Sequence, residues 1–260
     1  MWRVRGGPSN ARIRFRVHGR VGLARRLAVA VAAVAALVGP SFATLWVTTP
    51  DVSDIQQRVQ DLTAHYGVPL LAENEVPPQL AEAVVATEDE RFYQHHGIDS
   101  IGLGRALLYD FVNVCLCQGG STVSEQLVKD VYLGGSDLGR NKLSDMVLAL
   151  KAERVLTKPQ IMADYLSEIT TGFGKYGVTA AACAYYRAPL QGLTLGQYAL
   201  LAGVTQAPSL YDPTLNPALA QQRRSEVLAQ MVADHYVSPA DAQAANAEPI
   251  LARGPDRPGC

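Results

Sequence analysis

The chain carries one long uncharged and mostly apolar stretch directly after a cluster of arginines. Residues 27–50 contain no charged side chain, and the 26 residues before them contain eight Arg and no Asp or Glu. Roughly 20 apolar residues suffice for a helix to cross a bilayer, and flanking positive charge marks the cytoplasmic side of a span. The sequence therefore predicts a basic cytoplasmic tail at 1–26, a single transmembrane anchor at 27–50 and an extracytoplasmic remainder.

Two other interpretations of this end of the chain stay open. A cleaved signal peptide would use Leu27 to Val38 as its apolar region, Pro40 as the breaker and Ser41 to Ala43 as the cleavage site. A nucleic-acid-binding arm explains the arginines but not the apolar stretch after them. Beyond residue 50 the chain holds 15 basic and 24 acidic residues, so no nucleic-acid partner is predicted.

The remainder is predicted to be almost entirely helical. Leu80, Val84 and Val85 recur at helical spacing in a segment that begins with proline, and the segment after Ser121 ends at two glycines. No run alternates as a strand does. The predicted helical segments are 77–93, 121–135, 140–156, 158–170, 177–189, 193–208, 217–236 and 238–247. They give a juxtamembrane segment at 51–76, one helical domain at 77–248 and a polar tail at 249–260.

Four cysteines lie at positions 115, 117, 183 and 260. An exported domain can hold a disulfide, and Cys115 and Cys117 are too close in sequence to be natural partners. Either of them is therefore a candidate partner for Cys183, with free buried thiols as the alternative. The spacing does not indicate a zinc site.

The segment TEDERFYQHHGID places many titratable groups at the end of an apolar helical run. Leu80, Val84, Glu88 and Phe92 are spaced by four, so we expect Glu88 to end an apolar stripe. Partial burial would raise the pKa of its carboxyl toward the range that suits a general base. The structural alternative is a carboxylate at a helix end that pairs with Arg91 or a histidine.

Two further segments contain candidate binding or catalytic residues. In QGGSTVSEQLVKD, two glycines lead into Ser121, Thr122 and a predicted helix whose start favours anions; Thr122 with Glu125 also fits a capping box. In GRNKLSDMVLALKAE, Lys142 and Asp145 share a helix face, and the structural alternative is a weak surface ion pair.

Together these segments resemble the peptidoglycan glycosyltransferases, glycosyltransferase family 51, which include monofunctional transglycosylases and the transglycosylase domain of class A penicillin-binding proteins. The resemblance runs over about 82–247. The family's first motif, Glu-Asp-x-x-Phe-x-x-His-x-Gly, is matched in full, and most of its second, Gly-Gly-Ser-Thr-x-x-Gln-Gln-Leu-x-Lys-Asn, is matched as well. The matched residues are Glu88, Asp89, Phe92, His95, Gly97, Gly119 to Thr122, Gln126, Leu127 and Lys129.

The resemblance implies a mainly α, lysozyme-like fold with two lobes, and an enzyme that polymerises lipid II into glycan strands. It makes Glu88 the general base that deprotonates the acceptor sugar hydroxyl. Lys129 and Lys142 would neutralise the pyrophosphate leaving group. The remaining substrate-binding residues would be Asp89, Phe92, His95, Ser121, Thr122, Gln126 and Arg140, with Asp145 as the second catalytic carboxylate.

The chain departs from the family pattern around the phosphate site. Glu125 replaces the first glutamine of Gln-Gln and puts a negative charge where pyrophosphate should sit, and the third motif, Arg-Lys-x-x-Glu, has Asn141 for Arg and Asp145 for Glu. Arg140 is the candidate substitute for the lost arginine. An Asp carboxylate is retracted by about 1.5 Å, and a misplacement of about 1 Å can cost about 10²-fold in rate. Two other departures are Asp130 and Ser167, each in place of Asn.

These departures keep two other functions open. One is a catalytically impaired relative that binds lipid II or a cell-wall synthesis complex, and the other is a lysozyme-like, glycan-cleaving enzyme that uses Glu88 and Asp145 as a carboxylate pair. The implied partners are lipid II, the growing glycan strand and membrane lipid. No cofactor is required; Mg²⁺ or Mn²⁺ near Asp145 is an open alternative with a thin set of ligands.

Overall fold

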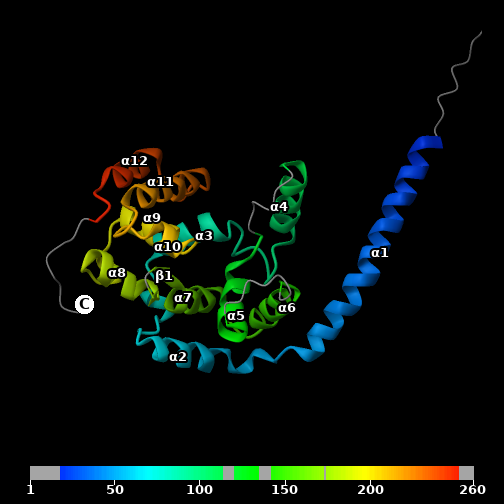
Figure 1. The fold of residues 1–260 in the computed structure, drawn as a ribbon, viewed down its shortest axis with the longest axis horizontal. Helices are drawn as coiled ribbons and strands as arrows, with labels where there is room; N and C mark the ends of the chain where they lie inside the picture. The colour runs from blue at the N-terminus through cyan, green and yellow to red at the C-terminus, as the bar shows by residue number, and fades with distance from the viewer. Residues whose placement is uncertain (1–17, 114–119, 135–141, 173, 252–260) are drawn as a thin grey trace, which may run out of the picture. The chain divides into compact units, whose positions relative to one another are not determined.

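A computed structural model describes residues 18–113, 120–134, 142–172 and 174–251, apart from several side chains near the N-terminal end (Figure 1). The chain divides into two units. One contains the long helix α1 (His18–Thr48), and the other begins at Thr49 and contains every other element.

Helix α1 includes most of the predicted membrane anchor. Thr44 and Thr48 turn their hydroxyls back onto the carbonyls four residues earlier, which satisfies them within the helix. Among the residues that the structure describes, no helix combines the length and the apolar character needed to cross a bilayer. The predicted span is therefore not confirmed.

The second unit is mainly helical, as predicted. Its helices are α2 (Ile55–Tyr66), α3 (Pro78–Glu88), α4 (Ser100–Asn113), α5 (Val123–Leu133), α6 (Lys142–Ala152), α7 (Lys158–Glu168), α8 (Val178–Tyr186), α9 (Leu195–Val204), α10 (Pro208–Tyr211), α11 (Pro217–Ala233) and α12 (Pro239–Ala247), with short 3-10 turns at Val52–Asp54, Glu73–Glu75 and Leu190–Gly192. The two-lobed, lysozyme-like arrangement stays a prediction.

A small hairpin differs from the expected all-helical pattern. Strands β1 (Thr170–Gly172) and β2 (Lys175–Tyr176) pair antiparallel. They are too short to show the alternation by which strands are recognised in a sequence. Gly172 and Gly174 adopt positive φ angles of 108° and 67°, which only glycine adopts readily.

The core is built around α9 (Leu195–Val204), in which every residue after Leu195 is buried. Helices α3 and α11 pack against α9, while α5 packs against α6 and α7. Val52, Ile55 and Val59, which lie in the predicted juxtamembrane segment, are also buried in the core. The segment at 51–76 therefore contributes to the packed unit and brings α2 against α5 and α7.

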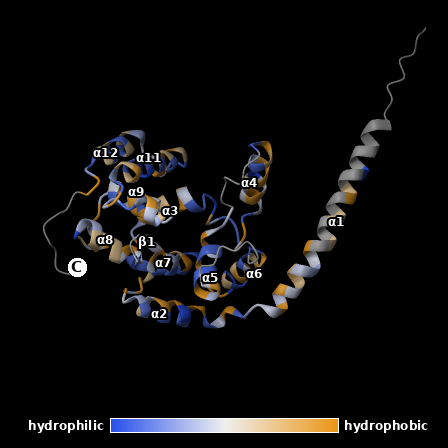
Figure 2. Cartoon of the chain, in the orientation of Figure 1, coloured by the Kyte–Doolittle hydropathy of each residue, from blue (hydrophilic) through white to orange (hydrophobic). Residues whose placement is uncertain are grey.

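Helix α4, which lies outside the predicted helical segments, exposes much of its apolar surface. Only Ala106 of its residues is buried, and Figure 2 shows the helix with extensive hydrophobic colouring. Phe111 is 83% exposed. Such an accumulation on one helix is unusual for a free surface of a soluble monomer. The other exposed large apolar residues of α4 are Ile101, Leu107, Leu108, Tyr109 and Val112.

Candidate active site

Glu88 is the last residue of α3. The helix starts at Pro78, where proline suits the first turn, and ends because Asp89 leaves helical geometry with φ −157° and ψ 72°. The prediction that Phe92 continues the same helical face is therefore wrong. Phe92 is nevertheless fully buried, in the turn that follows the helix.

The Glu88 carboxylate is held by a side-chain network. Gln126 Nε2 donates to Glu88 Oε2 at 3.0 Å, and the Tyr165 hydroxyl donates to Gln126 Oε1 at 3.3 Å. Burial raises the pKa of the Glu88 carboxyl, and the hydrogen bond from Gln126 only partly offsets this. The alternative pairing with Arg91 is wrong, because Arg91 Nε donates to Asp99 Oδ2 at 3.1 Å instead.

Asp89 links the first motif to the second through hydrogen bonds. Both oxygens of its buried carboxylate lie 2.9 Å from His95 Nε2, and Oδ2 also accepts from the backbone N–H of Val123 at 3.0 Å. Val123 is the first residue of α5. Asp89 and His95, predicted as substrate-binding residues, thus fix the start of α5 next to Glu88.

Thr122 has a structural role at the same helix start. Its hydroxyl donates to Gly97 O at 2.7 Å and accepts from the backbone N–H of Glu125 at 3.1 Å. This is the N-cap half of the predicted capping box. The reciprocal half is absent, because the Glu125 carboxylate turns to Lys142 rather than back to the helix start.

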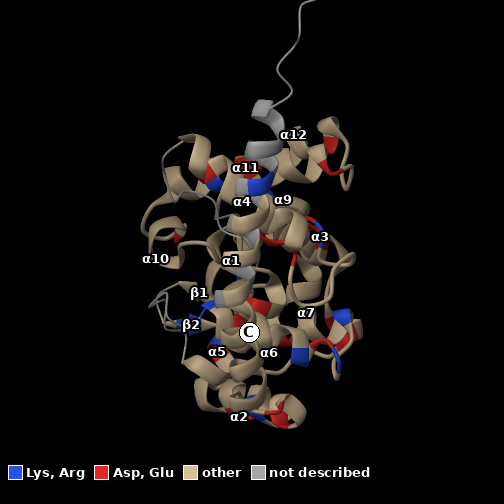
Figure 3. Ribbon diagram, turned by 90° about the vertical axis from the view of Figure 1, so that its right-hand side faces the viewer, with Lys and Arg blue, Asp and Glu red and all other residues tan. Residues whose placement is uncertain are grey.

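Lys142, the first residue of α6, joins the two helices. Its ammonium pairs with the Glu125 carboxylate and donates to the Ser121 hydroxyl at 2.8 Å. Figure 3 shows acidic and basic residues close together around α5 and α6. Burial raises the pKa of Glu125 to about 6, and the charge of Lys142 opposes this rise. The Lys142 ammonium thus links α6 to α5.

The other predicted residues lie on the same two helices or outside the described part of the chain. Lys129 lies on α5, half-buried, and its charge acts on the carboxyl of Glu168. Asp145 is buried on α6, and its charge raises the pKa of Glu125. Arg140 lies outside the described residues.

A cavity brings the first two motifs together. Glu88 and Asp89 line one part of it, and Ser121 and Thr122 line another. Leu103 of α4 also lines it, so the helix with the exposed apolar surface borders the same space. This cavity is where the predicted base faces the start of α5.

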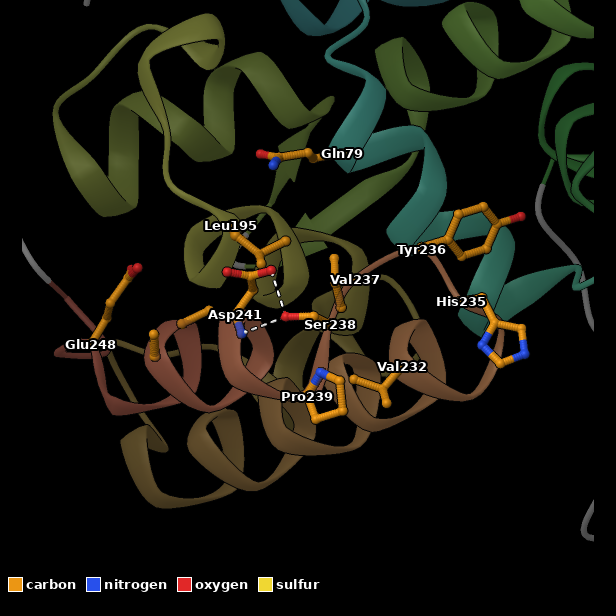
Figure 4. Close-up of a pocket in the computed structure, with 12 residues that line it drawn as sticks. Gln79, Leu195, Val232, His235, Tyr236, Val237, Ser238, Pro239, Asp241 and Glu248 are labelled. Carbon is orange, nitrogen blue, oxygen red and sulfur yellow. Dashed lines mark hydrogen bonds between the residues drawn. The ribbon is translucent and has the colours of Figure 1, made fainter.

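A wider cavity of about 870 Å³ lies elsewhere, between the end of α11 and the start of α12. Figure 4 shows Ser238 and Asp241 in hydrogen-bond contact at this place; the Ser238 hydroxyl donates to Asp241 Oδ2 at 2.6 Å and accepts from the Asp241 backbone N–H at 3.1 Å. These bonds cap α12. None of the predicted site residues lines this cavity.

A second network, which the sequence patterns do not predict, lies at the start of α5. The carboxylate of Glu153, whose side chain is 4% exposed, accepts from Lys158 Nζ at 2.7 Å and from the Ser124 hydroxyl at 2.5 Å. Lys158 Nζ also lies 4.2 Å from the ring centre of Phe92, a favourable cation–π arrangement. The hydroxyl of Ser124 at the start of α5 was the available signal, but its partner lies 29 positions away.

No sequence pattern predicts the burial of Glu168, the last residue of α7. It is 3% exposed, and its Oε1 atom has no hydrogen-bond partner. Burial raises the pKa of its carboxyl well above the ordinary value, and the charge of Asp130 adds to this while Lys129 opposes it. Its carboxyl is thus a buried acid that favours the protonated form.

We expect Glu168→Gln to stabilise the chain at pH 8. Because the pKa of this carboxyl is higher in the folded than in the unfolded chain, the folded state keeps the proton to a higher pH, and stability falls as pH rises between the two pKa values. Glutamine does not titrate, so the variant avoids this loss of stability. The unfolding temperature at pH 8 should rise by about 2–4 °C, which corresponds to a gain of about 1 kcal/mol in the free energy of unfolding. This gain should be smaller at pH 5. A gain of equal size at both pH values would contradict this account.

Cys183 forms a disulfide, and the other three cysteines lie outside the described residues. In the described part of the chain, no three His, Cys, Asp or Glu side chains are grouped so as to hold a metal ion.

Comparison with known proteins identifies the family. The family model described as transglycosylase matches residues 57–232. This chain belongs to the transglycosylase family, a family of glycosyltransferases. A protein of Cupriavidus necator that carries the name transglycosylase is 39% identical over 68% of this chain and 77% of its own length. The family-model match covers most of α2 through most of α11, and so includes α3, α5 and α6, which carry the candidate site.

Longer relatives share the same region. Penicillin-binding protein 1A of Vibrio cholerae is 39% identical over 73% of this chain, and that of Haemophilus influenzae is 40% identical over 68%. The chain spans 23% and 21% of their lengths, respectively. A crystal structure of the Haemophilus influenzae protein matches with a TM-score of 0.44 and 26% identity, over 71% of this chain and 18% of that one.

Proposed function

We propose that this transglycosylase polymerises lipid II into glycan strands, with Glu88 as the general base. The observation that carries the proposal is the placement of the Glu88 carboxyl, whose pKa is raised by burial, in one cavity with Ser121 and Thr122 at the start of α5. A base needs a pKa near the working pH. A helix start with a nearby ammonium suits a diphosphate.

The proposed reaction is a displacement at the donor sugar. Glu88 takes the proton from the acceptor sugar hydroxyl, whose oxygen forms a bond to the anomeric carbon of the growing chain. The bond from that carbon to the lipid diphosphate breaks, and the anomeric configuration inverts. Lys142 and Lys129 offset the negative charge that develops on the leaving diphosphate. Ser121 and Gln126 complete the binding site around it, with Arg140 and Asp145 as further contributors on the sequence pattern.

Membrane attachment belongs to the same proposal. The substrate carries a lipid, and α4 presents Leu107, Leu108 and Phe111 to the outside next to the cavity. Apolar side chains of this kind suit the boundary between headgroups and acyl chains. The uncharged stretch at 27–50 and the arginines before it predict an anchor with a cytoplasmic N-terminus.

One observation favours a second candidate, a relative that binds lipid II without turnover. The ammonium of Lys142 is already paired with Glu125, so the positive charge proposed for the leaving group is partly neutralised. An enzyme weakened in this way would retain the binding site. A glycan-cleaving function draws no comparable support, because Asp145 is linked electrostatically to Glu125 while Glu88 is hydrogen-bonded to Gln126.

The test is conversion of fluorescent lipid II by the full-length chain in detergent, followed by separation of the glycan products and measurement of free undecaprenyl diphosphate. Polymerisation predicts long glycan strands and one lipid diphosphate released per bond formed. Binding of lipid II without either product would support the second candidate. Release of small fragments from insoluble peptidoglycan would contradict both.

A further inference from the structure

Glu125 is a buried carboxylate inside the proposed diphosphate site, and no step of the transfer reaction uses it. It is 2% exposed and lies in the first turn of α5. Its carboxylate contacts the Lys142 ammonium, which itself lies 2.8 Å from the Ser121 hydroxyl. The three side chains therefore form one unit at the start of α5.

This arrangement leaves Lys142 able to bind one more group. An ammonium has three donor positions, and among the described residues Glu125 and Ser121 occupy two of them. The Lys142 side chain is 37% exposed, whereas that of Glu125 is 2% exposed. The remaining donor can therefore be approached from solvent, while Glu125 fixes the ammonium from the inner side.

The same geometry would place the substrate diphosphate close to the negative Glu125 carboxylate. A diphosphate bound to Lys142 and to the start of α5 would bring its oxygens close to the Glu125 carboxylate. Like charges that share a buried site cannot both remain ionised without a large cost, and one of them takes up a proton. Glu125 is the group poised to do so, because burial raises its pKa to about 6 and the charges of Asp145 on α6 and Asp89 after α3 add to the rise.

We propose that Glu125 is a positioning residue of the diphosphate site, which holds Lys142 against Ser121 in the free enzyme and takes up one proton from solvent when the substrate diphosphate binds. This inference rests on the proposed function. Proton uptake by Glu125, which occupies a position where the family pattern has glutamine, would make substrate binding depend on pH. Below about pH 6 Glu125 is already protonated and the penalty disappears.

The kinetic consequence is specific to binding. If one proton is taken up with the substrate, KM for lipid II should rise toward tenfold per pH unit above about pH 6. Replacement by Glu125→Gln keeps the size of the side chain and an oxygen that can accept from Lys142, but removes the titration. We therefore expect the variant to show a much flatter KM between pH 6.5 and 8, with kcat changed less than KM.

The matched control is Asp164→Asn. Asp164 is similarly buried, with 3% of its surface exposed, and burial raises its pKa to about 6. It accepts a hydrogen bond from Gln56 of α2 instead of contacting Lys142. A general effect of buried carboxyls on folding would appear in both variants. A role at the diphosphate site predicts that Asp164→Asn keeps the steep pH dependence of KM of the parent.

A second measurement does not depend on polymerisation. Calorimetric titration of the full-length chain with inorganic pyrophosphate, at pH 7.5 in two buffers of different ionisation enthalpy, reports the protons taken up on binding. We expect the parent and Asp164→Asn to take up more protons than Glu125→Gln. Equal proton uptake by all three proteins, or parallel KM profiles for the parent and Glu125→Gln, would overturn the inference. Absence of polymerisation by the parent would overturn the proposed function instead, and the pyrophosphate titration would still decide the role of Glu125.

Discussion

Glu88→Gln should lower the rate of lipid II polymerisation by about 10²–10⁴-fold, the usual contribution of a positioned general base. The amide cannot take the proton of the acceptor hydroxyl, yet its oxygen can still accept from Gln126, which lies 3.0 Å from Glu88 Oε2. The loss should therefore fall on kcat rather than on KM. Lipid II turnover under saturating substrate measures it directly.

The pH profile gives an independent check of the same role. Since burial raises the pKa of Glu88, the carboxylate form is lost, as pH falls, at a higher pH than for an exposed glutamate. Activity should decline on the acid side through that raised pKa, and the residual activity of Glu88→Gln should lack this decline.

Glu82→Gln is the matched control for Glu88→Gln. Glu82 lies on α3 as well, and burial also raises its pKa, but it does not line the cavity that Glu88 shares with Ser121. The control should keep the activity of the parent within about twofold. If Glu88→Gln stayed within a few-fold of the parent as well, another group would have to be the base.

The position of the proposed base could be predicted from the sequence because the residues that determine it lie close together in the chain. The spacing of Leu80, Val84 and Glu88 on one helix face predicts a carboxylate at the end of an apolar stripe, and α3 places it there. Thr122 at the start of a predicted helix becomes the N-cap of α5. Such local patterns depend on helix geometry alone.

The partners of these residues could not be predicted in the same way. Glu125 contacts Lys142 across 17 positions, and Ser124 contacts Glu153 across 29. Each pairing depends on how α5 and α6 pack, and the capping-box pattern gave Glu125 a different, local partner. The sequence predicts a helix up to residue 93, whereas α3 ends at Glu88. The reason is related, because the conformation of Asp89 follows from its bonds to His95 and Val123. These contacts are made by tertiary structure.

Gly97→Ala should destabilise the chain by about 3 kcal/mol or more, through strain at a special backbone position. Gly97 has a φ of +84°, and a Cβ there would lie 2.7 Å from the backbone nitrogen of Leu150 and 2.8 Å from the carbonyl carbon of Ala149. Backbone atoms of α6 cannot move aside as the end of a flexible side chain can. The expected fall in the unfolding temperature is about 6–12 °C.

Gly67→Ala separates this clash from the cost of the left-handed conformation alone. Gly67 has a φ of +68° with no atom within 4 Å of an added Cβ, so its substitution should cost only about 1–2 kcal/mol. Gly97→Ala should also reduce transfer activity at temperatures where the chain stays folded. The carbonyl of Gly97 accepts from Thr122 at 2.7 Å, and its displacement would shift the start of α5 relative to Glu88. Equal losses of stability in the two variants would show that α6 yields to the new methyl group, and the link from the first motif to α5 would then be looser than these contacts imply.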